Sequence, residues 1–116
     1  MTLQVVTVLA NMSAVEACVA DIRQQHGVEL LVEFLHERSP DAATDAELTA
    51  CEHVQQKSAI ALSRLCRDVS NAHLVVGAKG LPRLMQLCRE PSERNNSDAV
   101  LVSCLVSGDV MSQSFK

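Results

Sequence analysis

Two segments of the chain repeat the same pattern of apolar residues behind a glycine, 53 residues apart. His26-Gly27 and Lys79-Gly80 each precede a run in which apolar residues recur at helical steps of three, four and seven. The apolar positions that coincide are Val28 with Leu81, Leu31 with Leu84, Phe34 with Leu87, and Leu35 with Cys88. This repetition predicts a unit of a short helix, a glycine corner, a second helix and a longer helix, used more than once.

The sequence therefore predicts an all-α chain. Helices are expected at about 2–13, 14–26, 28–38, 46–68, 71–79, 82–90 and 98–107. Ser13-Ala-Val-Glu16 and Thr44-Asp-Ala-Glu47 have the form of capping boxes, which predict helix starts. Gly27 and Gly80 are expected to close short helices, where glycine tolerates a left-handed backbone.

The predicted helices group into repeats joined by exposed loops. Residues 39–45 and 91–97 are rich in Pro, Ser, Asp and Asn, which indicates loops. We expect residues 1–107 to comprise a partial third helix (2–13), a repeat over 14–68 and a second over 70–107. Leu65 and Leu105 lie 40 residues apart, the spacing expected of such arrays. Residues 108–116 diverge from the pattern and are expected to form a disordered tail.

Composition narrows the function classes. Ten basic and fourteen acidic side chains give a net charge of -4, which disfavours a nucleic-acid surface. No apolar run approaches the roughly 20 residues that span a bilayer, so membrane insertion is not expected. The N-terminal residues lack the features of a signal peptide. Five scattered cysteines (Cys18, Cys51, Cys66, Cys88 and Cys104) favour a cytoplasmic chain with free, mostly buried thiols.

No catalytic, cofactor or metal site is expected. Cys51 and His53 are the only close Cys/His pair, and residues at i and i+2 of a helix point to different sides. The stretch Gly77-Ala-Lys-Gly80 lacks the spacing of a phosphate loop and is better explained as a repeat corner. Glu29 and Glu33, one turn apart, are interpreted as a solvated helix face rather than an acid/base pair.

The same segments carry a family resemblance. "ADIRQQHGVELLVEFL" and "HLVVGAKGLPRLMQL" resemble first-to-second-helix junctions of armadillo repeats, and "AIALSRLCRD" and "VLVSCLVS" resemble third-helix cores. "CEHVQQKSAIALSRLCRD" is similar to the C-terminal repeats of the inscuteable family. The resemblance implies an armadillo-type α-α superhelix (solenoid) fragment of about two repeats plus partial ends. It also implies a protein-binding adaptor for polarity and spindle-orientation complexes in asymmetric cell division, in the cytoplasm and at the cell cortex.

Armadillo grooves bind extended peptides through an Asn and an aromatic residue on the third helices. Asn11 falls on the Asn position of that pattern, but Thr7 occupies the aromatic one. The corresponding pairs are Arg64 with Ile60, and Cys104 with Val100. Lys57, Arg64 and Arg67 would present positive charge to an acidic partner. The candidate groove residues are Thr7, Asn11, Lys57, Ile60, Arg64 and Val100, and the alternative is an ordinary solvated helix face.

Two other functions remain open. A truncated solenoid could be purely structural, without independent binding. A transport receptor for basic peptides would require acidic groove residues and repeated Trp/Asn pairs, which the sequence lacks. The apolar residues of 3–12 and 100–110 lie at the two ends of the array, where a repeat has no neighbour. Self-association through these uncapped ends is therefore expected.

Overall fold

The computed structural model describes residues 2–115, which form seven α-helices, one 3-10 helix and no strand. The prediction of an all-helical chain is therefore confirmed, and residues 1 and 116 lie outside the described part. The elements are α1 (Thr2–Ser13), α2 (Glu16–Gln24), α3 (Gly27–Leu35), α4 (Asp45–Leu65), α5 (Val69–Gly77), α6 (Gly80–Arg89), η1 (Pro91–Arg94) and α7 (Asp98–Ser114).

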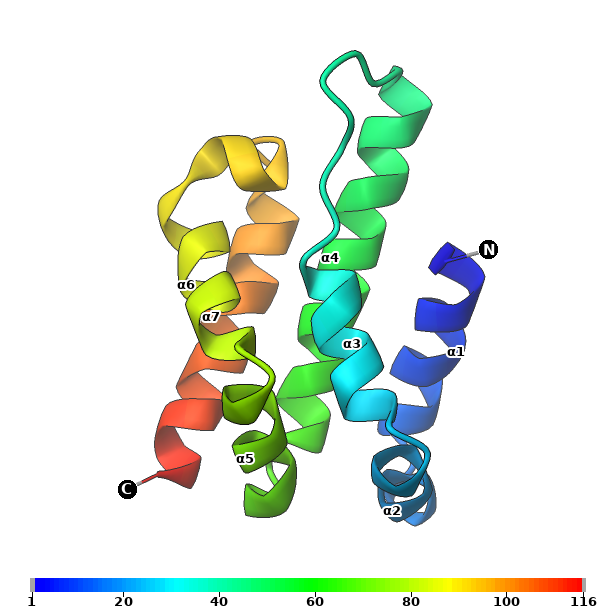
Figure 1. The fold of residues 1–116 in the computed structure, drawn as a ribbon, viewed down its shortest axis with the longest axis vertical. Helices are drawn as coiled ribbons and strands as arrows, with labels where there is room; N and C mark the ends of the chain where they lie inside the picture. Colours follow the sequence, from blue (N-terminus) through cyan, green and yellow to red (C-terminus); the bar gives the residue numbers. More distant parts are fainter. Residues whose placement is uncertain (1, 116) are drawn as a thin grey trace.

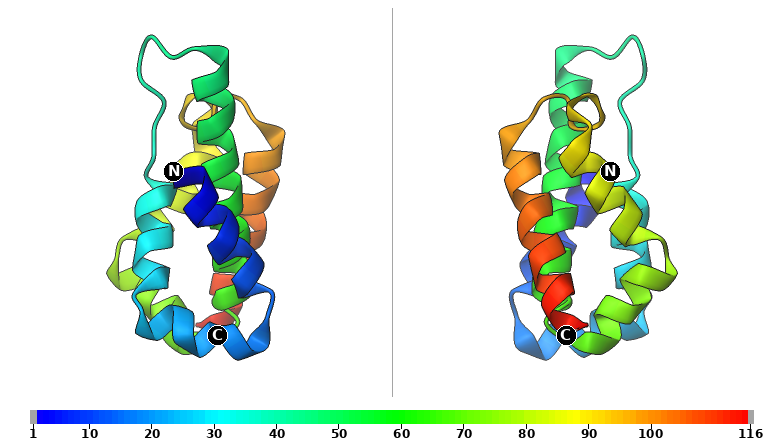
Figure 2. Two further views of the ribbon diagram at one scale, coloured as in Figure 1. Left: turned by 90° about the vertical axis from the view of Figure 1, so that its right-hand side faces the viewer. Right: turned by 90° about the vertical axis from the view of Figure 1, so that its left-hand side faces the viewer.

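The helices form two layers. Helices α1, α4 and α7 lie side by side, with α4 in contact with both neighbours. Helix α3 packs on α4 and α6 packs on α7, so that α3 and α6 belong to a second layer on one side of the first (Figure 2). The series α2–α3–α4 and α5–α6–α7 both consist of two short helices followed by a long one. The repetition in the sequence thus corresponds to a repetition of three-helix units in space.

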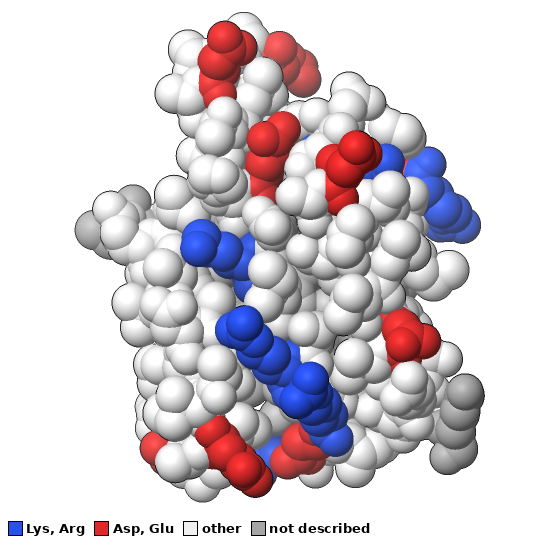
Figure 3. Space-filling view, turned by 180° about the vertical axis from the view of Figure 1, so that it is seen from behind, with Lys and Arg blue, Asp and Glu red and all other residues white. Residues whose placement is uncertain are grey.

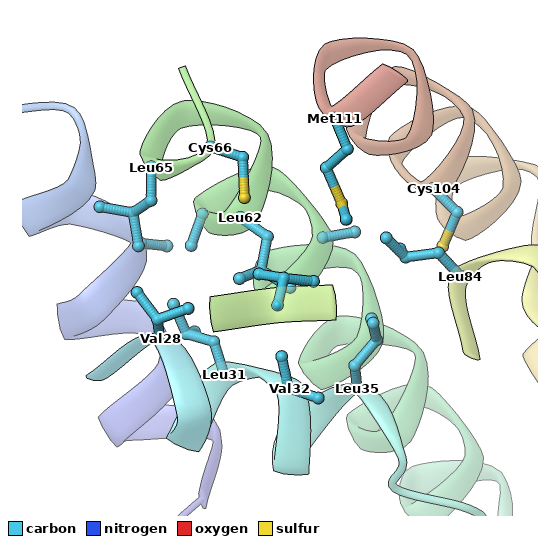
Figure 4. Close-up of a cluster of buried hydrophobic side chains, with 14 of the residues drawn as sticks. Val28, Leu31, Val32, Leu35, Leu62, Leu65, Cys66, Leu84, Cys104 and Met111 are labelled. Carbon is cyan, nitrogen blue, oxygen red and sulfur yellow. The ribbon is translucent and has the colours of Figure 1, made fainter. Parts of the chain in front are cut away.

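The core lies between the two layers. Figure 4 shows leucines and valines of α3 pointing toward Leu62 on α4, with Met111 of α7 and Leu84 of α6 continuing the cluster. Leu31 and Leu62 are completely buried. Burying such a side chain contributes roughly 1.5–3 kcal/mol, so this shared cluster holds the two units together.

The two glycine corners differ from the expectation in one respect. The left-handed residues are His26 (φ 63°) and Lys79 (φ 64°), while Gly27 and Gly80 are the first residues of α3 and α6. A Cβ at Gly80 would lie 2.5 Å from Val75 Cγ1. Glycine is needed here because the chain passes so close to the preceding helix, and not because of its φ angle.

Only one of the two predicted capping boxes is present. Glu47 N–H donates to Thr44 Oγ1 and Thr44 N–H donates to the Glu47 carboxylate, which together start α4. At the predicted box of Ser13 and Glu16, the N-cap residue of α2 is Val15, whose side chain makes no capping hydrogen bond. Ser13 Oγ instead donates to the carbonyl of Ala10, 2.6 Å away. The Ser13 hydroxyl therefore bonds to a carbonyl in the last turn of α1 and does not cap the start of α2.

The prediction of a disordered tail is wrong for the described residues beyond 107. Helix α7 continues to Ser114, and Met111 is buried in the core. Ser114 Oγ donates to the carbonyl of Cys66 at the end of α4 (2.8 Å). These contacts tie the last turns of α7 to α4, and Lys116 lies outside the described residues.

The connection over 91–97 is more ordered than a loop. It contains η1, and Arg94 at its end is 7% exposed. Arg94 Nη1 donates to the carbonyl of Leu87 (2.9 Å), which lies in the last turn of α6. A cationic side chain therefore satisfies a carbonyl that the helix leaves unpaired.

Candidate protein-binding surface

The outer side of the α1–α4–α7 layer carries most of the predicted groove residues. Lys57, Ile60 and Arg64 follow one another at steps of three and four on α4, so they share one helix face. Thr7 and Asn11, 53 residues before Ile60 and Arg64, hold the same places on α1. We call this surface the rear face and define it by these five residues. Asn11 and Arg64 are exposed, whereas the other three are partly buried.

Val100 does not belong to the rear face. It is completely buried, as is Cys104 at 1% exposure. The buried residues of α7 (100, 103, 104, 107 and 111) all match buried residues of α4 (51, 54, 55, 58 and 62) at a shift of 49 and not 40. The structural counterparts of Ile60 and Arg64 on α7 are therefore Asp109 and Gln113, both of which are exposed.

The rear face has a basic row over α4, and this row ends at Arg67, which we count as a sixth residue of the rear face. Figure 3 shows a band of Lys and Arg running across the middle of this side, with acidic groups toward its margins. Lys57, Arg64 and Arg67 supply cations at steps of seven and three along α4 and just beyond it. None of the three is in a salt bridge within residues 2–115. Their charge is therefore available to a partner.

Arg64 has a second contact that fixes its position. Its Nη1 donates to the carbonyl of Ala10 in the last turn of α1, at 2.8 Å. A cation at the C-terminal end of a helix is favourable because it faces the negative end of the helix dipole. The guanidinium thereby bridges α1 and α4 while its side chain remains exposed.

Next to Arg64 the surface is hollowed into a groove of about 770 Å³ between α2 and the end of α4. Arg23, Arg64, Arg67 and Asp68 line it, together with Glu16. Arg23 Nη1 donates to Asp68 Oδ2 at 2.8 Å. This bond, aided by the backbone N–H of Ser70, lowers the pKa of the Asp68 carboxyl. Asp68 thus neutralises the charge of Arg23, whereas Arg64 and Arg67 have no salt bridge within residues 2–115.

Helix α7 adds an apolar strip beside the basic row, which sequence reasoning did not identify. The strip consists of Val102 and Val106, which are 59% and 49% exposed. Val102 and Val106 stand one turn apart and are the counterparts of His53 and Lys57 on α4 at the shift of 49. The i, i+4 spacing of the two valines could have indicated this strip in the sequence. The expected shift of 40 residues between α4 and α7 was incorrect, so the valines were not matched to His53 and Lys57.

The remaining reactive groups are separated from one another. Burial raises the pKa of the Cys66 and Cys104 thiols to about 12, so both stay protonated at neutral pH. Cys51 is buried while His53 is exposed, so they point to different sides of α4. Within residues 2–115 no three His, Cys, Asp or Glu side chains are grouped as metal ligands. No helix in that range is both long and apolar enough to cross a membrane.

Comparison with known proteins gives a consistent result. The chain is 54% identical over 104 residues to the protein inscuteable homolog of Mus musculus and 53% identical to that of Homo sapiens. Each match covers 90% of this chain but only 18% of the relative. No solved structure matches. The family described as "Protein inscuteable C-terminal" matches residues 2–115, and the chain therefore belongs to this family.

Proposed function

We propose that this chain is a non-catalytic, protein-binding adaptor segment that serves polarity complexes which orient the mitotic spindle, at the cell cortex. Its membership of the inscuteable C-terminal family supports an adaptor role. We also propose that the units α2–α3–α4 and α5–α6–α7 are armadillo-type repeats of an α-solenoid. The support for this is the recurring order of helices and the packing of α4 between α1 and α7.

The rear face is the proposed binding surface, and its ligand is an acidic segment of a protein partner. The observation that carries this proposal is the row of three cations, Lys57, Arg64 and Arg67, which have no carboxylate partner within residues 2–115, on a chain whose net charge is -4. The apolar strip of Val102 and Val106 beside the row suits a segment that alternates acidic and apolar side chains. Complementary charge would speed association and select against basic competitors.

The test uses a fluorescent twelve-residue peptide of Glu, Ala and Leu, with a Lys-containing peptide of the same pattern as its counterpart. The variant is Lys57→Glu/Arg67→Glu. Arg64 is left unchanged because it also holds the Ala10 carbonyl. The matched control is Lys79→Glu/Arg89→Glu, which changes the net charge equally at exposed positions outside the rear face.

We expect the wild-type chain and the control to bind the acidic peptide and the rear-face variant to bind it at least about tenfold more weakly, a loss of about 1.4 kcal/mol. Binding should also weaken with added salt, because exposed charges are screened. Equal binding by both double variants would refute the assignment of the rear face. Preference for the Lys peptide would favour a carrier of basic peptides, and no binding of either peptide would favour a purely structural segment.

The cellular part of the proposal requires a separate measurement. The same three proteins are used as baits in extracts of dividing polarised cells, followed by quantitative mass spectrometry. We expect components of polarity or spindle-orientation complexes to be enriched by the wild-type chain and by the control, but not by the rear-face variant. If no such component depends on Lys57 and Arg67, the adaptor role is not exercised through this surface.

A further inference from the structure

The contact between the two three-helix units has a well-defined geometry. At the corner between α5 and α6, a Cβ at Gly80 would lie 3.1 Å from Val32 Cγ2 of α3, so the second unit's glycine corner rests on this valine. At the other end of α5, the side chain of Arg23 in α2 bonds to Asp68, the residue before the helix. These two contacts mark which surfaces of successive units meet.

The same surfaces recur on the outer sides of the pair, where nothing covers them within residues 2–115. The counterpart of Val32 53 residues later is Met85, which is 48% exposed although Val32 is 2% exposed. The counterpart of Arg23 is Val76, 43% exposed, and that of Asp68, 53 residues earlier, is Val15, 50% exposed. Both positions of the internal ion pair are thus occupied by exposed valines on the outer surfaces.

The leading face is the outer surface of the first unit with α1, defined by Val5, Val8, Met12, Val15 and Leu30. Along α1, Val5 and Val8 are 38% and 56% exposed. Their counterparts in α4, Ser58 and Ala61, are completely buried. An apolar groove of about 430 Å³ runs here between α1 and α3, past Gly27.

The trailing face is the outer surface of α5, α6 and α7, defined by Val76, Leu81, Met85, Cys88 and Leu105. The counterparts of Leu81, Met85 and Cys88 in α3 are Val28, Val32 and Leu35, and all three are buried. A groove of about 310 Å³ between α6 and α7 contains Met85, Cys88 and Leu105. The trailing face therefore repeats the surface of the first unit on which the second unit already sits.

We propose that a second copy of this chain binds head to tail, with its leading face on the trailing face of the first. The glycine corner at Gly27 of one copy would then rest on Met85 of the other, as Gly80 rests on Val32 within the chain. Val15 would meet Val76 in place of the internal ion pair. Because two different surfaces are joined, the interface is heterologous and can be extended by further copies.

The mass of the 116-residue chain is measured by sedimentation velocity over about 10 µM to about 1 mM, which covers weak dissociation constants. The weight-average mass of the wild-type chain should rise with concentration above the monomer mass of 12.6 kDa. Val8→Glu blocks the leading face and Met85→Glu blocks the trailing face. Val102→Glu is the matched control, since its counterpart His53 remains exposed within the chain.

Each blocked variant should stay at the monomer mass alone, whereas an equimolar mixture of the two should form a dimer that does not grow. That dimer joins the intact trailing face of Val8→Glu to the intact leading face of Met85→Glu. The control should associate as the wild type does. Circular dichroism checks the fold, and Val8→Lys or Met85→Lys takes the place of a Glu variant that unfolds.

Three results would overturn the proposal. The first is a wild-type chain that remains monomeric up to about 1 mM, as expected if only a different helical unit fits these faces. The second is a mixture of the blocked variants that forms no dimer. The third is that only one of the variants Val8→Glu and Met85→Glu loses association, which would indicate a two-fold symmetric contact through a single face. Since none of these depends on Lys57 or Arg67, they are distinguishable from a failure of rear-face binding.

Discussion

Arg83 is the most buried charged side chain of the junction between the two units, at 2% exposure. Its Nε donates to the carbonyl of Leu35 (2.9 Å) and its Nη2 to that of Glu37 (3.2 Å), both at the end of α3. Its Nη1 reaches Gln86 (2.9 Å) and the carboxylate of Glu93 (2.6 Å). We predict that Arg83→Ala destabilises the chain strongly, because it leaves these acceptors without the guanidinium.

The size of the effect follows from which acceptors keep another donor. Gln55 Nε2 also donates to the Glu37 carbonyl, at 3.2 Å. Arg38 also pairs with the Glu93 carboxylate, at 3.1 Å. The Leu35 carbonyl loses its only side-chain donor within residues 2–115. Removing one partner of a buried ion pair typically costs about 3–5 kcal/mol, and the retained donors place the expected loss near the lower end, at about 3 kcal/mol.

Urea denaturation followed by circular dichroism measures this loss, with Arg89→Ala as the control. Arg89 lies on the same helix but is exposed, so its replacement should change the free energy of unfolding by less than about 0.5 kcal/mol. For a chain of this size the expected loss at Arg83 lowers the Tm by about 12 °C. If Arg83→Ala were as stable as the Arg89 control, the network would contribute nothing net and the reasoning would be refuted.

Further predictions concern stability and the reactivity of the buried thiols. Gly80→Ala should lower the free energy of unfolding by about 1–3 kcal/mol, because a Cβ there would lie 2.5 Å from a side-chain carbon. Gly77→Ala is the control and should be tolerated, because a Cβ at Gly77 would have nothing within 4 Å. Thermal melts in which Gly77→Ala is the less stable of the two would contradict the close approach at Gly80. Thr44→Ala removes the capping box and should lower the free energy of unfolding in urea by about 1 kcal/mol. Burial raises the pKa of Cys66 and Cys104 from 9.0 to about 12, so native-state alkylation at pH 8 should spare both. Because the unfolded thiols ionise first, the stability they contribute below pH 9 should be lost as the pH rises from 9 to about 12, and a flat pH profile there would count against it.

Much of the fold was predictable because its signals are local. The first helix was expected at 2–13, which are its observed bounds. The Thr44 capping box and the two glycine corners involve residues within a few positions of one another. Such patterns depend on backbone geometry over one or two turns, and that geometry is determined by the neighbouring residues themselves.

The register of α7 was not predictable in the same way. Leu65 and Leu105 look equivalent as apolar residues 40 positions apart, but Leu65 is completely buried and Leu105 is 55% exposed. An apolar helix such as α7 has little contrast between its faces, so only its neighbours decide which side is buried. This error placed Val100 in the candidate groove and ended the helix at residue 107 rather than at Ser114.

The buried arginines were missed for a different reason. Arg83 and Arg94 would be assigned to the surface by residue type, since charged side chains are rarely buried without partners. Most of their partners are backbone carbonyls, which no sequence pattern identifies. Arg83 bonds to a carbonyl 48 residues away, and that distance in sequence is bridged only once the two units pack. The same limit applies to Arg64, whose bond to the Ala10 carbonyl decides how it lies on the rear face.

These directional bonds also separate the internal junction from the proposed contact between copies. Within the chain, Arg23 with Asp68 and Arg83 with the Leu35 carbonyl fix the angle between units, because hydrogen bonds weaken steeply when misaligned. At the outer faces the counterpart of Arg83 is Leu30, and that of the ion pair is Val76 with Val15. Apolar contacts are non-directional, so they allow the same surfaces to meet without fixing the angle. The contact between copies should accordingly be weaker and more variable in angle than the internal junction.

Replacing Val15 by Asp and Val76 by Arg would restore the ion pair of the internal junction, and this double variant should associate more tightly than the wild type in the same sedimentation measurement. If it associates less tightly, the two junctions are not built on the same register.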